Sequence, residues 1–443
     1  MLRTFRIGGI HPPENKLSAG KKIITLTIPE QVVIPLGQHI GAPAQAVVKK
    51  GDPVKVGTLL GKSGGFVSAH IHSSVSGKVN KVDNAIDASG YMRPAIYIDV
   101  EGDEWEETID RSEALKRECS LSPKEIIEKI TEAGVVGLGG ATFPTQVKLT
   151  PPPGYRAEIL IINGVECEPY LTSDHSLMTE KGEQVLTGAV ILMKAIGVTK
   201  AIIGIENNKP DAMVYLKDLA KKYPGIEIMP LKVQYPQGGE KQLIDAVIRR
   251  QVKSGALPIS VGAVVQNVGT AYAVYEAVQK NKPLIERVVT VTGKGVANPS
   301  NFLARIGTPV RNLIEAVGGI PENTGKIIGG GPMMGKALVS AEVPVTKGSS
   351  GILILLREEA VRKPVYNCIR CAKCVTVCPM GLNPTLLMNV TEFANWKIAE
   401  KNYIVDCIEC GSCSFTCPAN RPLLDYIRLG KGKVMGVIRA RKS

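Results

Sequence analysis

The middle of the chain alternates between helical and β-strand patterns of apolar residues. At Ser122, a serine–proline pair suited to a helix start precedes apolar residues at helical spacing. Residues 157–164 and 200–206 are instead short runs of β-favouring residues, the first ending in a polar turn. Strands that alternate with helices predict an α/β domain with a parallel sheet, which we place at residues 119–286.

The N-terminal part, residues 1–118, predicts short strands between glycine turns. Its segments K-K-G-D-P-V and V-S-G-K-V resemble the turns and strands of a barrel-sandwich hybrid. Such domains carry a biotinyl or lipoyl group on a lysine in an M-K-M or D-K-A triplet, and neither occurs at the expected hairpin tip. We therefore expect a structural or partner-binding domain with an N-terminal arm. His70 and His72 alternate on one strand and would form a metal site only with a further ligand.

The C-terminal half predicts two further domains. Residues 287–319 begin like a hairpin and continue as a helix, which resembles the small β-grasp insert of the SLBB type, placed here at residues 287–345. The glycine-rich run 327–335 is not followed by Lys-Ser/Thr, so a structural loop is favoured over a phosphate loop. Residues 349–362 predict a strand and a linker into an α-helical, cysteine-bearing module at residues 360–443.

Length and composition agree with a multidomain α+β protein. At 443 residues the chain is too long for one hydrophobic core. No apolar run approaches the roughly 18 residues of a membrane span, and residues 1–10 lack the apolar core of a signal peptide. We expect a reducing, cytoplasmic location, where clustered cysteines are more often metal ligands than disulfides.

The positive charge is concentrated in the tail. The formal net charge is +13, and residues 361–443 hold 13 Lys or Arg against 5 Asp or Glu. No nucleic-acid motif accompanies this charge, and only 5% of residues are aromatic, so stacking on bases is not expected. The charge suits anionic metal clusters in the tail, an acidic partner or an anionic membrane face.

Two cysteine runs share the pattern C-x2-C-x2-C-x3-C-P, at residues 368–379 and 407–418. In two-cluster bacterial ferredoxins, the fourth cysteine of each run ligates the other run's cluster. That rule predicts two [4Fe–4S] clusters. Their ligand sets are Cys368, Cys371, Cys374 and Cys417, and Cys407, Cys410, Cys413 and Cys378. Zinc or disulfides are weaker alternatives, because neither explains the third x2-spaced cysteine or the x3-C-P ending. The isolated Cys119 and Cys167 suit burial as small apolar residues.

A glycine-rich segment, residues 137–145, begins a series of four motifs. Alone it fits either a tight loop or a loop that receives a phosphate or flavin. With the segments 163–169, 238–241 and 264–270, it resembles the NADH-oxidising flavoprotein subunit of respiratory complex I, including its F-P-x-x-x-K, N-x-D-E-x-E-P and N-N-V-E-T motifs. The sequence departs from that family at Val165 and Gly239, where the family has acidic residues.

This resemblance implies a site for FMN and NAD(H). The residues it places there are Gly137, Gly139, Gly140, Ala141, Phe143, Lys148, Asn163, Glu166, Glu168, Gly238, Gly239, Glu240, Lys241, Asn267 and Thr270. It implies that Lys148 pairs with phosphate or ribityl oxygens and Phe143 stacks on the nicotinamide, whereas Glu168 and Glu240 orient the nucleotide. Hydride exchange would occur at the flavin itself, so no catalytic side chain is expected.

The order of the four domains, together with G-G-I-H-P-P-E-N-K near the start, is similar to that of the C-subunits of Rnf complexes, which are ion-translocating ferredoxin:NAD oxidoreductases. The resemblance implies exchange of hydride between NAD(H) and FMN and one-electron relay through two [4Fe–4S] clusters. It also implies membrane subunits and an iron–sulfur subunit as partners, and a peripheral position on the cytoplasmic side of the bacterial cell membrane. Alternatives are a soluble reductase of the cobalamin reductase type and a non-enzymatic iron–sulfur scaffold.

Overall fold

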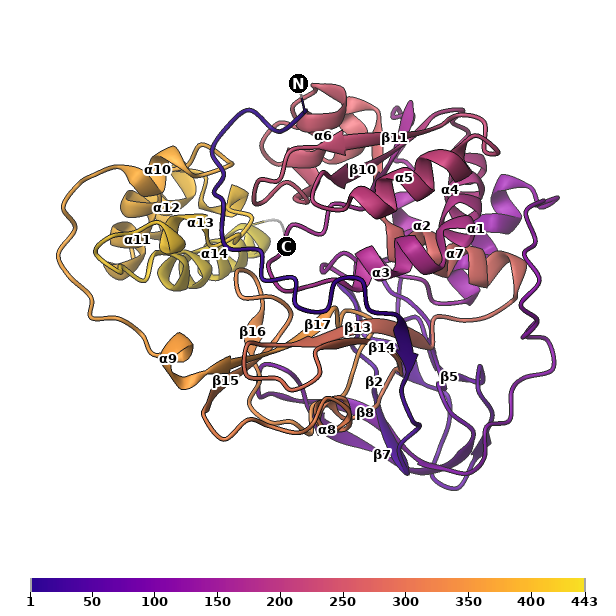
Figure 1. Ribbon diagram of the computed structural model, residues 1–443. Helices are drawn as coiled ribbons and strands as arrows, with labels where there is room; N and C mark the ends of the chain where they lie inside the picture. Colours follow the sequence, from indigo (N-terminus) through magenta and orange to yellow (C-terminus); the bar gives the residue numbers. More distant parts are fainter. Residues whose placement is uncertain (1, 442–443) are drawn as a thin grey trace.

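A computed structural model describes residues 2–441 of the chain. Figure 1 shows the helical, cysteine-bearing module beside the α/β domain, with the mixed sheet and the barrel below them. The four regions follow one another along the chain in the predicted order, and the mixture of helix and sheet confirms the expected fold class.

The α/β domain is built on a parallel sheet in the order β11-β10-β9-β12, which confirms the sequence prediction. Its strands are β9 (Ile159–Asn163), β10 (Ala201–Glu206), β11 (Ile226–Leu231) and β12 (Ala263–Asn267). Its helices are α1 (Pro123–Glu132), α2 (Thr145–Lys148), α3 (Ser173–Glu180), α4 (Gly182–Ile196), α5 (Pro210–Ala220), α6 (Glu240–Ile248) and α7 (Val268–Gln279), with a 3-10 turn η1 (Pro258–Val261).

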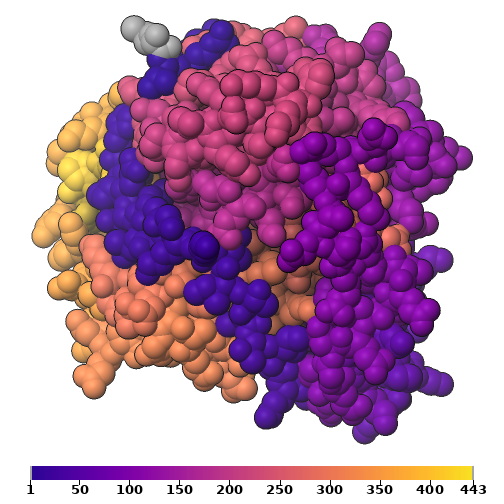
Figure 2. Space-filling model, turned by 45° about the vertical axis from the view of Figure 1, so that its right-hand side comes forward, coloured from indigo at the N-terminus to yellow at the C-terminus, as the bar shows by residue number. Residues whose placement is uncertain are grey.

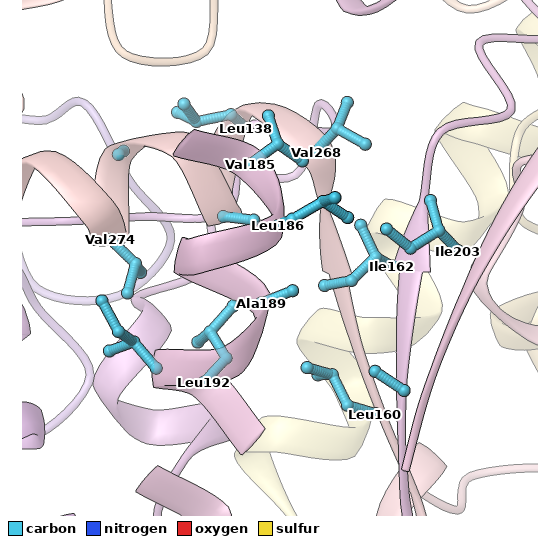
Figure 3. Close-up of a cluster of buried hydrophobic side chains, with 14 of the residues drawn as sticks. Leu138, Leu160, Ile162, Val185, Leu186, Ala189, Leu192, Ile203, Val268 and Val274 are labelled. Carbon is cyan, nitrogen blue, oxygen red and sulfur yellow. The ribbon is translucent and has the colours of Figure 1, made fainter. Parts of the chain in front are cut away.

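Local sequence explains how these elements begin and pack. Ser122 caps α1 through a reciprocal capping box with Glu125, and a proline occupies the first turn, as expected. Helices α4 and α7 can approach closely because Gly188 has no side chain. A Cβ at this position would lie only 1.8 Å from the backbone oxygen of Ala271. Figure 3 shows the resulting core, in which Leu186 and Ala189 of α4 lie near Ile162 of the sheet. These apolar side chains are fully buried, and their burial is the main stabilising contribution of the domain.

The N-terminal domain has two small sheets packed around one apolar core. One sheet has the order β2-β8-β7-β4 and the other β3-β5-β6. Their strands are β2 (Gln31–Pro35), β3 (Gln45–Ala46), β4 (Pro53–Val54), β5 (Leu59–Lys62), β6 (Ile71–His72), β7 (Gly77–Ile86) and β8 (Met92–Val100). In β2, buried Val32 and Ile34 alternate with more exposed residues, as a sheet with one face on the core requires. His70 accepts a hydrogen bond from the backbone of Ser63.

A mixed sheet in the order β1-β14-β13-β17-β15-β16 forms the third domain. Its elements are β1 (Ile23–Thr25), β13 (Glu286–Thr292), β14 (Ser300–Arg305), α8 (Val310–Ala316), β15 (Thr324–Gly329), β16 (Lys336–Ala337) and β17 (Gly351–Leu356). The hairpin and the helix after it match the sequence prediction. The sheet also takes β1 from the N-terminal arm and β17 from beyond residue 345, so it exceeds the expected segment.

The cysteine-bearing module is helical and internally repeated. After α9 (Arg357–Ala360), it contains α10 (Lys373–Thr376), α11 (Pro384–Glu392), α12 (Trp396–Lys401), η2 (Ile404–Asp406), α13 (Ser412–Phe415) and α14 (Leu423–Ala440). Each cysteine run enters a four-residue helix, α10 or α13, through a residue with positive φ, Ala372 or Gly411. A longer helix follows each run, so the sequence repeat is also a structural repeat.

The N-terminal arm connects distant parts of the molecule. It forms backbone bridges from Arg3 to Leu231 and from Ile10 to Tyr235 of the α/β domain before reaching β1. Figure 2 shows it, in indigo, running over the surface between the α/β domain and the more C-terminal regions. No helix within residues 2–441 combines the length and apolar character needed to cross a membrane.

Candidate functional site

The parallel sheet has a topological switch point between β9 and β12. The chain moves from β9 to β10 and β11 on one side and then returns to place β12 on the other side of β9. Ligands of open α/β sheets bind in the crevice at the carboxyl ends of such strands. The last residues of β9 and β12, Asn163 and Asn267, pair in register at that edge, and both are predicted site residues.

The four motifs predicted from the sequence converge on this edge. A Cβ on Gly139 would lie 3.4 Å from the Cβ of Asn267, and the backbone N–H of Leu138 donates to Thr270 Oγ1 at 2.9 Å. The side chain of Asn163 donates to the backbone oxygen of Gly238 at 2.9 Å. Segments separated by about a hundred residues along the chain therefore form one site.

The glycine-rich loop leaves backbone exposed at this site. The N–H of Gly137 donates to the oxygen of Phe143 at 2.8 Å, which closes the loop. Gly140 has a φ of +117°, and a Cβ there would meet no atom within 4 Å. Gly139, Gly140 and Ala141 are exposed. This is open backbone that a flat ring or a phosphate could approach closely.

Lys148 and Glu240 form the charged pair of the site. The ammonium of Lys148 lies 2.6 Å from Glu240 Oε1 and also donates to the backbone oxygen of Val265 at 3.1 Å. Both side chains are about one-third exposed, so their charges remain accessible. Glu240 is the first residue of α6 and follows Gly239, the N-cap, whose backbone leads into the helix N-terminus. The side chain of Lys241 instead points to the backbone oxygen of Lys253.

Two carboxylates predicted for the site, Glu166 and the nucleotide-orienting Glu168, are engaged elsewhere. Glu166, at a φ of +47°, accepts from the backbone N–H groups of Asp174 and His175 at the start of α3. Glu168 accepts from the N–H groups of Met333 and Met334 at 2.7 and 2.9 Å, and burial raises its pKa. The carboxylate of Glu168 thus binds backbone amides of the glycine-rich run 327–335. This fits the interpretation of that run as a structural loop.

Three charged residues near the site were not singled out from the sequence. Asp174 accepts from Asn267 Nδ2 at 2.7 Å, and burial raises the pKa of its carboxyl to about 7. Arg287, fully buried, donates to the backbone oxygen of Leu138. Lys16 of the N-terminal arm donates to the backbone oxygens of Glu166, Glu168 and Leu171. Each reaches the site through tertiary contacts, so no local sequence signal marks it.

The second predicted set of cluster ligands is brought together in the structure. Cys378 of the first run and Cys407, Cys410 and Cys413 of the second line one cavity with apolar walls that include Leu387 and Ile427. Burial raises the pKa of Cys407 to about 11 and that of Cys413 to about 12, and neighbouring thiols of the set contribute to both shifts. The predicted exchange of Cys378 between the runs therefore has a geometric basis. We name this the buried site.

The other set is only partly enclosed. Cys374 and Cys417 pack in one apolar cluster with Met388 and Leu423, whereas Cys368 and Cys371 are exposed. We name this the exposed site. Within residues 2–441, no three His, Cys, Asp or Glu side chains are grouped as ligands of a single metal ion. That finding does not count against a cubane, because its four thiolates bind four different irons at separate corners.

The buried site packs directly against the α/β domain. Tyr235, which precedes the loop to α6, donates its hydroxyl to the backbone oxygen of Cys410 at 2.8 Å. Gln242 of α6 donates to the backbone oxygen of Pro379 at 3.1 Å. The N-terminal arm closes the junction, because the N–H of Gly9 donates to Val377 and a Cβ on Gly8 would lie 2.6 Å from the backbone of Cys378.

Family models match all four regions. The barrel-sandwich hybrid domain of RnfC matches residues 4–103 and the Nuo51 FMN-binding domain matches residues 130–276. The SLBB domain matches residues 288–337 and a 4Fe-4S dicluster domain matches residues 367–421. The fold and these sites define a flavin- and iron–sulfur-binding oxidoreductase chain.

Similar proteins over nearly the full length identify the family. The C-subunit of the proton-translocating ferredoxin:NAD(+) oxidoreductase complex of Clostridium ljungdahlii is 47% identical, over 98% of this chain and 94% of its own. The C-subunit of the Na(+)-translocating complex of Acetobacterium woodii is 45% identical, over 98% and 97%. The chain belongs to the RnfC family, the C-subunits of ion-translocating ferredoxin:NAD(+) oxidoreductases.

A solved structure shares the fold. The crystal structure of an NAD+-reducing [NiFe]-hydrogenase in the H2-reduced state aligns with a TM-score of 0.51 and 20% identity, over 71% of this chain and 63% of the hydrogenase chain. At this identity the likeness concerns the arrangement of the chain alone.

Proposed function

We propose that this chain is the NAD(H)- and FMN-dependent electron-transfer subunit of an ion-translocating ferredoxin:NAD oxidoreductase complex. FMN, when bound, would supply the exchange of two-electron hydride with NAD(H) and of single electrons with the two [4Fe–4S] clusters. The observation that carries the proposal is the position of the buried site, which packs on the loop before α6, at the switch-point edge of the flavin domain. The partners are the other subunits of the complex.

The chain's own residues have distinct tasks in this proposal. The open backbone at Gly139 to Ala141 admits the flavin, and Asn163 and Asn267 fix its position from the ends of β9 and β12. Lys148 offers a positive charge to ribityl or phosphate oxygens, and Glu240 holds that ammonium until the nucleotide is bound. Phe143 is half-buried beside the loop and suits stacking on a ring. Glu166 and Glu168 support the site by holding α3 and the 327–335 loop.

The two cysteine sites define an order of transfer. The buried site adjoins the flavin domain, so it is the proximal site, and its apolar walls restrict access of solvent. The exposed site lies farther along the module and reaches the surface at Cys368 and Cys371, so it is the distal site and the exit toward partners. The proposed exchange of Cys378 and Cys417 between the runs requires the two sites to lie next to each other.

We place the chain on the cytoplasmic face of the membrane, held there by its partner subunits. The domain limits we propose are 1–118, 119–286, 287–345 and 360–443, with β1 and β17 joining the sheet of the third. The relatives in C. ljungdahlii and A. woodii are named for different ions, although both are nearly half identical to this chain. Similarity in this subunit therefore does not indicate which ion is moved.

Reconstitution of the flavin site tests the proposal. The chain is loaded anaerobically with iron, sulfide and FMN, and NADH-driven reduction of a dye is followed. Glu240→Ala is expected to retain FMN and to lose most of this activity, because Lys148 loses its partner. Glu227→Ala, on the exposed edge strand β11, is the matched control. Equal activity in the parent and Glu240→Ala would remove Glu240 from the site, and an inactive, flavin-free parent would overturn the proposed function.

A further inference from the structure

Residues 361–373 form an arc on the outer side of the cysteine-bearing module. Figure 1 shows this arc as the connection from α9 to α10, on the side of the module away from the α/β domain. Every residue in it is exposed, and no helix or strand forms between α9 and α10. We name this segment the exit arc, because it carries Cys368 and Cys371 of the exposed site.

The exit arc is anchored to the module although it is exposed. The N–H of Tyr366 donates to the backbone oxygen of Ala419 at 3.0 Å, and the side chain of Asn420 donates to the oxygen of Pro364 at 3.0 Å. Arg362 pairs with Asp425 of α14 at 2.9 Å. Its outer surface is therefore a defined face, which does not have to order when a partner arrives.

This face combines exposed apolar side chains with charged residues that are all basic. Tyr366 is 60% exposed, Ile369 is 70% exposed, and the valines of the arc are exposed by more than half. The arc contains four basic residues and no acidic residue, namely Arg362, Lys363, Arg370 and Lys373. Aromatic and arginine residues at the centre of a patch with a polar rim are typical of protein interfaces, whereas isolated exposed apolar residues are not.

We propose that the exit arc is the docking face for an acidic, redox-centre-carrying subunit of the same complex. This inference rests on the proposed function and adds the face and the chemistry of the partner. The four basic residues, of which Arg362 is already paired with Asp425, are complementary to an acidic rim, and they would also speed encounter at low salt. A lipid surface is the less suitable occupant, because the arc includes thiols of the distal site and a lipid cannot take an electron from them.

The transfer at this face is a single-electron exchange without bond making. A cluster held by the thiols of the exposed site would give up one electron when electrons leave NADH, and the redox centre of the partner would take up that electron. In the opposite direction the roles are reversed. The exit arc therefore has to hold the partner close to Cys368 and Cys371, and it needs no proton-transfer group.

Rebinding to membranes tests the face without relying on electron transfer. Membrane vesicles from cells that lack this chain but retain the other subunits are incubated with the purified, cluster-loaded protein, and the bound fraction is measured by sedimentation. The variant is Lys363→Glu/Tyr366→Ala, both outside the cysteine run. The control is Lys50→Glu/Tyr91→Ala, an exposed pair of the same types in the barrel domain. Vesicles of phosphatidylglycerol and phosphatidylethanolamine alone serve as the lipid probe.

The variant is expected to bind at least about tenfold more weakly than the parent at low salt, and its binding should depend less on salt concentration. The control should bind as the parent does, and lipid-only vesicles should not distinguish the three proteins. Unchanged binding of the variant would overturn the proposal, and so would parallel loss of binding to lipid-only vesicles. NADH-to-dye activity and iron content of the same samples test the proposed function separately, because a dye accepts electrons without the exit arc.

Discussion

The two cysteine sites are nearly identical in sequence and different in surroundings. Both runs read C-x2-C-x2-C-x3-C-P, and both enter a short helix through a residue of positive φ. The buried site, however, is walled by apolar side chains and contacts the flavin domain, whereas the exposed site has two cysteines at the surface. Motif spacing thus predicts the ligands, whereas the packing of the whole chain sets the surroundings of each site, on which the proposed order of electron transfer rests.

Replacing one cysteine in the buried site should have the largest effect. Cys378→Ala is expected to lower the iron content from about eight to about four atoms per chain, because one of two [4Fe–4S] clusters is lost. Iron analysis and electron paramagnetic resonance (EPR) spectra of the reduced protein measure this.

The spectra also test the exchange of ligands between runs. Cys378→Ala should resemble Cys410→Ala, although Cys410 lies in the other run, and it should differ from Cys371→Ala. The isolated Cys119→Ala is the control and should retain both clusters. A Cys378→Ala spectrum that matched Cys371→Ala would disprove the assignment of Cys378 to the buried site.

The second-largest effect should be a difference between the two sites in the rate at which a chelator removes iron. A chelator applied to the oxidised protein is expected to remove iron from the exposed site at least about tenfold faster than from the buried site, since solvent reaches only the former freely. The loss is followed by absorption and by the EPR signal of each cluster. Simultaneous loss from both sites would contradict the asymmetry.

The prediction of structure from sequence succeeded where the signal is local or has a fixed spacing. The N-cap at Ser122 and the parallel sheet could both be inferred, and the crossed role of Cys378 stays a prediction with which the shared cavity agrees. The different exposure of the two runs could not, because it depends on contacts of the second run with Tyr235, far away in the sequence. The ordering of residues 361–373 on the surface likewise depends on tertiary contacts.

The flavin site shows the same division. Only the resemblance predicted that the segments of Lys148, Asn163 and Glu240 belong to one site, and the switch point explains physically why these segments meet. The sequence did not predict that Glu168 would bind the 327–335 loop. The local sequence does not indicate which backbone amide groups Glu168 binds. The packing of the third domain brings the amide of Met333 to its carboxylate.

Removing one hydrogen bond at the junction should produce a smaller, one-sided effect. Tyr235→Phe deletes the hydroxyl that donates to the backbone oxygen of Cys410, within a buried interface. The reduction potential of the buried site should fall by tens of millivolts, because a donor dipole favours the more negative reduced state. The exposed site should keep its potential, and Tyr403→Phe, an exposed tyrosine of the same module, should leave both unchanged. Redox titration monitored by EPR measures the two potentials, and equal shifts in both would contradict a local junction.

The smallest expected effect is a change in pH dependence. Burial raises the pKa of Glu168 above its usual value of 4.5, so the folded state disfavours the ionised form. Stability from this residue is complete below about pH 4.5 and decreases as the pH rises toward the raised folded value. Glu168→Gln should keep the acceptor oxygen for Met333 and Met334 and should remove this slope. Denaturant midpoints across that pH range measure it, and an unchanged slope would show that another group is responsible.

The order of the two sites is the central claim, and NADH reduction of single-cluster variants tests it most directly. Cys417→Ala keeps only the buried site and Cys378→Ala keeps only the exposed site, which iron content verifies. After anaerobic mixing with NADH and rapid freezing, EPR should show a reduced cluster promptly in Cys417→Ala. In Cys378→Ala the remaining cluster should be reduced by dithionite but only slowly by NADH. Prompt reduction in Cys378→Ala, with slow reduction in Cys417→Ala, would contradict the account.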